Sequence, residues 1–125
     1  MAITIQPLTL DAAEKIISDA DVDETAEVDV NHGAAKIVAL VLDNTANSAT
    51  TYLKLYNTAT VTVGTTVPDL VLMVLASVTR TMVIKSRSYA GLYFDTALTL
   101  AAVTAGGTAG TTGPTSAALL DVVLG

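Results

Sequence analysis

The chain has 125 residues, a mass of 12.8 kDa and no cysteine, so it is one domain without disulfides, thiolate nucleophiles or cysteine-based metal sites. Its net charge of −6 and its pI of about 4.3 argue against a surface that follows nucleic-acid phosphates. Hydrophobic residues make up 51% of the chain and aromatic residues only 4%, so small aliphatic side chains must form its core.

The first residues, Met1–Leu10, are extended in pattern and uncharged, without the basic region and long apolar run of a signal peptide. We expect residues 1–14 to form an extended N-terminal arm and residues 15–125 to form a single β-sandwich domain. The candidate interface residues are the large aliphatic side chains of the arm, Ile3, Ile5, Leu8 and Leu10.

The segment Asp11–Ser18 fits two patterns. Asp11 could cap two helical turns, but the β-branched pair Ile16 and Ile17 favours an edge strand beginning at Lys15. A strand or an extended arm is the preferred interpretation.

The next segment alternates, with Ala26, Val28 and Val30 opposite Glu27 and Asp29, which predicts a half-buried strand. Asn-His-Gly at 31–33 predicts a turn. The continuously apolar run from Ala35 to Asn44 then predicts a strand buried on both sides.

Thr51–Asn57 predicts a strand with Leu53 and Leu55 toward the core. On its other side we expect the hydroxyls of Tyr52 and Tyr56 and the ammonium of Lys54 to reach water. A short strand over residues 60–63 should follow and end at Gly64.

The second half predicts strands within 70–76, 79–85, 89–95, 97–106 and 117–125, with a flexible Gly/Thr loop over Gly106–Ser116. Roughly eight strands spaced by about 8–12 residues are typical of an all-β protein. We therefore predict an antiparallel β-sandwich with jelly-roll or Greek-key-like connections.

Acidic residues are concentrated near the start, where seven of the twelve lie between Glu14 and Asp29. Asp19, Asp21, Asp23 and Glu24 resemble the beginning of a calcium-binding loop. The required glycine is replaced by Glu24 and the bidentate glutamate by Val30, so a solvated acidic turn is preferred and an irregular cation site stays open.

Other candidate chemistry is weak. His32, the only histidine, lies in a turn pattern without a neighbouring nucleophile. The segment Gly106–Ser116 lacks the lysine that a phosphate-binding loop needs. We expect no enzymatic activity, no catalytic or metal-binding residues and no cofactor.

The pair of motifs YLKLYN and VGTTVP, within Tyr52–Pro68, resembles small all-β structural proteins of tailed-phage virions. The resemblance extends over about Ala35–Gly125, but the segment LVLMVLASVTRTMVIKSRSY departs from the pattern. It implies a virion component without catalytic residues.

The resemblance and the excess of apolar residues together predict a capsid decoration (cement) protein on the virion surface, made in the cytoplasm of the bacterial host. Its partners would be the major capsid protein and copies of itself, as a trimer, with neither nucleic acid nor membrane involved. The alternatives are a tail, neck or baseplate β-module and, less well supported, a receptor- or carbohydrate-binding module.

Overall fold

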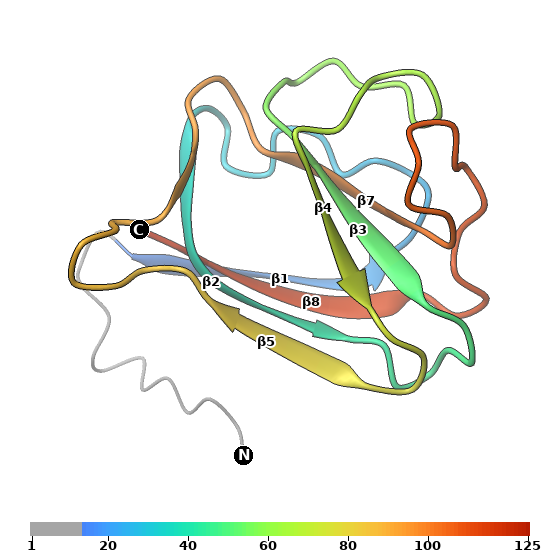
Figure 1. The fold of residues 1–125 in the computed structure, drawn as a ribbon. Helices are drawn as coiled ribbons and strands as arrows, with labels where there is room; N and C mark the ends of the chain where they lie inside the picture. Colours follow the sequence, from blue (N-terminus) through green and yellow to red (C-terminus); the bar gives the residue numbers. More distant parts are fainter. Residues whose placement is uncertain (1–13) are drawn as a thin grey trace.

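The computed structural model describes residues 14–125, which contain eight strands and no helix (Figure 1). The predicted arm and its interface residues Ile3, Ile5, Leu8 and Leu10 lie outside the described residues, apart from residue 14. The strands are β1 (Lys15–Val22), β2 (Ala35–Asp43), β3 (Thr51–Tyr56), β4 (Leu70–Val74), β5 (Thr79–Val83), β6 (Leu92–Phe94), β7 (Thr99–Val103) and β8 (Ala118–Leu124).

The strands form two antiparallel sheets, which confirms the all-β prediction. The first sheet has the order β1-β8-β2-β5, with β6 pairing the beginning of β2, and the second has the order β4-β3-β7. The two sheets lie one above the other in a sandwich-like arrangement (Figure 1). In the described part of the chain, no helix could cross a membrane.

The core lies between the sheets, because alternate residues of the central strands point to the same side. Leu53 and Leu55 of β3 are fully buried, as predicted, and belong to the same core cluster as Leu40 and Leu42 of β2. The remaining buried core side chains are aliphatic except for Phe94, and they come from both sheets: Val22, Ala35, Ile37, Leu72, Val74, Leu98, Leu100, Ala102, Ala118, Leu120, Val122 and Leu124.

A buried polar junction joins the two sheets where β2 leads into β3. Asn44 and Thr51 are completely buried, and the Thr51 hydroxyl donates to Asn44 Oδ1 at 2.8 Å. The Asn44 amide lies within hydrogen-bonding distance of the carbonyls of Ala49, Val74 and Leu75. The segment that connects β2 to β3 thus fixes the ends of β3 and β4.

Two predicted strands are absent from the described structure. Residues 26–30 form only one isolated bridge, Glu27 with Leu100, because Asp29 adopts a left-handed backbone with φ of 49°. Residues 60–63 form a turn in which the amides of Thr65 and Thr66 donate to the Thr62 carbonyl. In both segments the alternation of apolar and polar residues wrongly predicted a strand. Neither segment is paired with a neighbouring strand over all of its residues.

The outer side of β3 is covered rather than wet. Lys54 and Tyr56 are fully buried, and the Tyr56 hydroxyl has no hydrogen-bond partner in the described structure. The prediction that these polar groups reach water is therefore wrong. For Lys54 the reason is tertiary: the loop that begins at Gly106 folds over this side of β3, where the Lys54 ammonium donates to the carbonyls of Gly107 and Gly110.

Leu55→Ala should lower the free energy of unfolding by about 2–5 kcal/mol, because it leaves a cavity between the sheets. Chemical denaturation measures this cost. Leu75→Ala makes the same truncation at a side chain that is 56% exposed, and it should cost less than about 1 kcal/mol. Equal costs at the two positions would contradict the assigned core.

Candidate functional site

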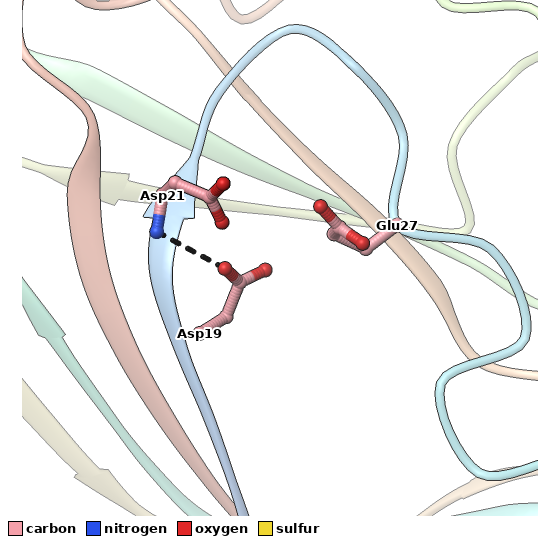
Figure 2. A group of neighbouring side chains, drawn as sticks. All are labelled: Asp19, Asp21 and Glu27. Atoms are coloured by element: carbon pink, nitrogen blue, oxygen red, sulfur yellow. Dashed lines mark hydrogen bonds between the residues drawn. The ribbon is translucent and has the colours of Figure 1, made fainter.

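Three carboxylates converge at the end of β1. Asp19 and Asp21 lie on the strand and Glu27 on the following loop, and an oxygen of each lies within 4.8 Å of one from each of the others (Figure 2). The backbone amide of Asp21 donates to Asp19 Oδ1 at 3.1 Å, which is the dashed line in Figure 2. The sequence pattern did not indicate Glu27, because only the loop after β1 brings it back to the strand.

The other two predicted members of the acidic group do not join this cluster. Asp23 accepts a hydrogen bond from the Thr25 amide, which closes a local turn. The carboxylate of Glu24 lies against Gly113. The spacing of ligands along a calcium-binding loop is therefore absent.

The environment of the cluster raises the pKa of Asp19 from its ordinary 3.8 to about 6. Partial burial is the main cause, followed by a hydrogen bond with the Asp21 side chain and repulsion from Glu27 and Asp21. Since the folded protein holds this proton more tightly than the unfolded chain does, ionisation of Asp19 lowers stability.

We expect the Asp19 carboxyl to titrate near pH 6 when its side-chain carbon is followed by NMR in dilute protein. Glu27→Gln should lower that pKa, because it removes a negative charge from the cluster. The contribution of Asp19 to the free energy of unfolding should be most favourable below about pH 4, decrease between pH 4 and 6, and stay constant above.

Asp95→Asn is the matched control, because it removes a carboxylate in a loop far along the chain and should leave the Asp19 titration unchanged. An Asp19 pKa near 4 in the unmodified protein would contradict the geometry of the cluster.

His32 lies in the predicted turn. Its backbone is left-handed, with φ of 54°, and its amide donates to the Asp29 carbonyl at 3.0 Å. The Asp29 carboxylate also accepts from the Gly33 amide. These contacts explain the Asn-His-Gly sequence as a turn.

The Gly/Thr loop is held by a buried cation. Lys54 Nζ donates to the carbonyls of Gly107 at 2.8 Å, Gly110 at 3.0 Å and Thr108 at 3.3 Å. Burial lowers the pKa of this ammonium. The loop was predicted to be flexible, and Lys54 holds only its amino-terminal half in this way. Lys54 is therefore a structural residue, a role that the strand pattern did not indicate.

Lys54→Met should destabilise the protein by about 2–3 kcal/mol, because it leaves three loop carbonyls without a charged donor. Hydrogen exchange at the amides of residues 104–113 should become faster. Lys15→Met is a matched control at an exposed position and should change neither quantity. Unchanged exchange in Lys54→Met would show that the loop is held by other contacts.

An exposed apolar region lies beside β4 and β5, and we name it the apolar edge: Met73, Leu75, Val78 and Val83. Val83 is 75% exposed and Leu75 56%. Met73, Leu75 and Val78 line a surface hollow of about 380 Å³ together with Thr79 and Arg80, whereas Val83 lies at the far end of β5 and outside this lining. Large apolar side chains grouped in this way are typical of a surface that contacts another protein.

The exposed aromatic residues form a smaller feature. Tyr89 and Tyr93 are exposed, and the Lys36 ammonium lies 5.5 Å from the centre of the Tyr93 ring. Tyr52 and Tyr56 cover the second sheet, as expected for two of the four tyrosines. The carbohydrate-binding alternative is thus left with two exposed rings.

No family model matches the chain, and no curated protein matches it. The resemblance to phage virion proteins therefore remains a prediction from the sequence motifs. The structural features that bear on function are the apolar edge and the acidic cluster.

Proposed function

We propose that this chain is a capsid decoration (cement) protein of a tailed phage, which binds the major capsid protein and holds neighbouring capsid subunits together. The apolar edge is the observation that carries the proposal. A chain of this size that leaves Met73, Leu75 and Val78 exposed around one hollow, with Val83 also exposed on β5, has a surface suited to protein contacts.

The fold supports a mechanical role. The described residues bury an aliphatic core between two sheets, and the polar groups singled out in the sequence have structural partners: His32 in a turn and Lys54 on a loop. Such a domain resists deformation through packing and hydrogen bonds. Decoration proteins need this property, because they oppose the outward pressure on a filled capsid by burying area between subunits.

The proposal includes a Greek-key or jelly-roll-like connectivity. Its support is the position of β8, the last strand, which lies between β1 and β2 and pairs with both. In a Greek key, a long connection likewise returns a strand to lie beside an earlier one.

In this proposal the capsid contact involves the N-terminal segment, whose residues Ile3, Ile5, Leu8 and Leu10 would supply the apolar side chains of an added strand. The described chain begins with Glu14, which forms an ion pair with Lys85 at 3.4 Å. This contact ties the first described residue to the segment that follows β5.

The decisive experiment is to purify virions, determine the number of copies of this chain per major capsid protein, and image where they lie. A fixed ratio with density on the capsid surface is expected. Density confined to the tail, neck or baseplate would replace the proposal with the alternative β-module, and absence from virions would end both.

Deleting Met1–Leu10 should leave a folded domain that no longer loads onto capsids, because the core lies in the remaining residues. Circular dichroism tests the fold, and co-sedimentation with undecorated capsids tests loading. Gln6→Ala is the control, since it changes the segment without removing a large apolar side chain. Normal loading after the deletion would remove the segment from the mechanism.

A further inference from the structure

Within residues 14–125, no strand pairs with the outer side of either edge of the first sheet. Among the described residues, β1 pairs only with β8, and β5 pairs only with β2. Each edge strand therefore offers unpaired backbone amides and carbonyls along its outer side. Such edges tend to pair with other strands unless something covers them.

The register of the sheet places residues that could pair with each other at the same position along the strand direction on the two edges. Residues paired from strand to strand form rows that cross the sheet from β1 to β5. One row has its side chains on the side of the sheet that faces the core, and a second row has them on the opposite, outer side. The first row is Asp19, Leu120, Leu42 and Arg80, and the second is Ile16, Val123, Ala39 and Val83.

The strand directions also match. β1 is antiparallel to β8, β8 to β2, and β2 to β5, so β1 and β5 run in opposite directions. A second copy that is related by rotation about an axis parallel to the strands would therefore present β1 antiparallel to β5 of the first. Without a shift along the axis, residues of one row would meet.

We propose that β5 of one copy of this chain pairs with β1 of a second copy, so that the first sheet continues from copy to copy with Arg80 opposite Asp19. The interface is head-to-tail: each copy uses β5 toward one neighbour and β1 toward the other. Interfaces of this kind close into rings when the rotation permits, and a trimer is one such ring.

Charge complementarity identifies the occupant as a second copy. No acidic residue occurs between Asp69 and Asp95, the stretch that contains β4 and β5, whereas Arg80 lies on β5 itself. The β1 side carries Asp19 and Asp21, with Glu27 beside them. Arg80 uses one guanidinium nitrogen, Nη1, on the Met73 carbonyl, which leaves other N–H groups for a carboxylate.

The apolar residues agree with this pairing. Val83 is 75% exposed and Ile16 is 44% exposed, and both lie on the outer side in the second row. In the continued sheet they would be a cross-strand pair of β-branched side chains, which stabilises adjacent strands. The partner would also cover part of the apolar edge.

The acidic cluster acquires a role in this arrangement. Within one copy, Asp19 is surrounded by the like charges of Asp21 and Glu27. A guanidinium from a neighbour would favour the ionised carboxylate and would offset that repulsion. The inference goes beyond the proposed function, because it concerns contacts between copies alone and can be tested without capsids.

The test uses the purified full-length chain and its charge reversals, Arg80→Glu and Asp19→Arg. Sedimentation velocity should show that the unmodified chain associates between micromolar and about millimolar concentration, and that each reversal weakens association by about tenfold or more. Arg87→Glu makes the same charge change outside β5 and should leave association unchanged. Circular dichroism verifies that every variant is folded.

Rescue separates a direct pair from indirect effects. The double variant Arg80→Glu with Asp19→Arg should associate more strongly than either single variant. Mixing the two single variants should also produce complexes that contain both chains, because the reversed charges then face each other at one interface.

Three results would overturn the proposal. The first is a full-length chain that stays monomeric from micromolar to about millimolar concentration. A chain that associates only after residues 1–13 are removed counts as the same result, because that segment would then cover an edge. The second is unchanged association in both reversals. The third is loss of association in Arg80→Glu but not in Asp19→Arg, which would indicate a symmetric contact between two β5 strands.

Discussion

The buried amide of Asn44 is the constraint on which the arrangement of the two sheets depends. Asn44 Oδ1 accepts from the Thr51 hydroxyl and from the Asn47 amide, and its own amide faces the carbonyls at the end of β4. Asn47 in turn donates to the Ser116 carbonyl and accepts from the Ser116 amide. Three connections between strands thus meet at two side chains, in a site where an unpaired polar group would be costly.

A second set of contacts holds the opposite end of β3. The Asn57 side chain donates to Asp95 and accepts from the amides of Thr96 and Ala97, while its backbone amide donates to Asp69. Together with Lys54 beneath the Gly/Thr loop, these residues fix the loops around the second sheet. A core of small aliphatic side chains gains precision from such polar contacts, because Val, Leu and Ala packing alone tolerates several arrangements.

The two sides of the first sheet differ in a way that matters for function. The side of β5 carries Arg80 and the exposed Val83 and has no acidic residue, whereas the side of β1 carries Asp19 and Asp21, the exposed Ile16 and one cation, Lys15. A domain with complementary opposite edges is suited to repetition, because each copy supplies what the next one lacks. The proposed head-to-tail pairing of copies makes use of this property.

The sequence by itself determined the strands β2 and β3, which lie inside their sheets, and the edge strand β1. The apolar run of β2, the Leu53 and Leu55 alternation of β3, and the strand at Lys15 were all predictable, because period-two burial is a local property of the chain. The same local rule failed at residues 26–30 and 60–63. Their alternation is real, but a strand also needs a partner along its length.

Only the tertiary structure decided which polar residues are buried and which of them lie together. Lys54 looks like a solvent-facing residue until a loop more than 50 positions later folds over it, and Glu27 joins Asp19 only because the chain turns back after β1. The edge positions of β1 and β5, with Asp19 and Arg80 at the same position along the strand direction, likewise follow from strand order and register. The physical reason is that burial and charge environment arise from contacts distant in sequence, whereas strand propensity arises from neighbours along the chain.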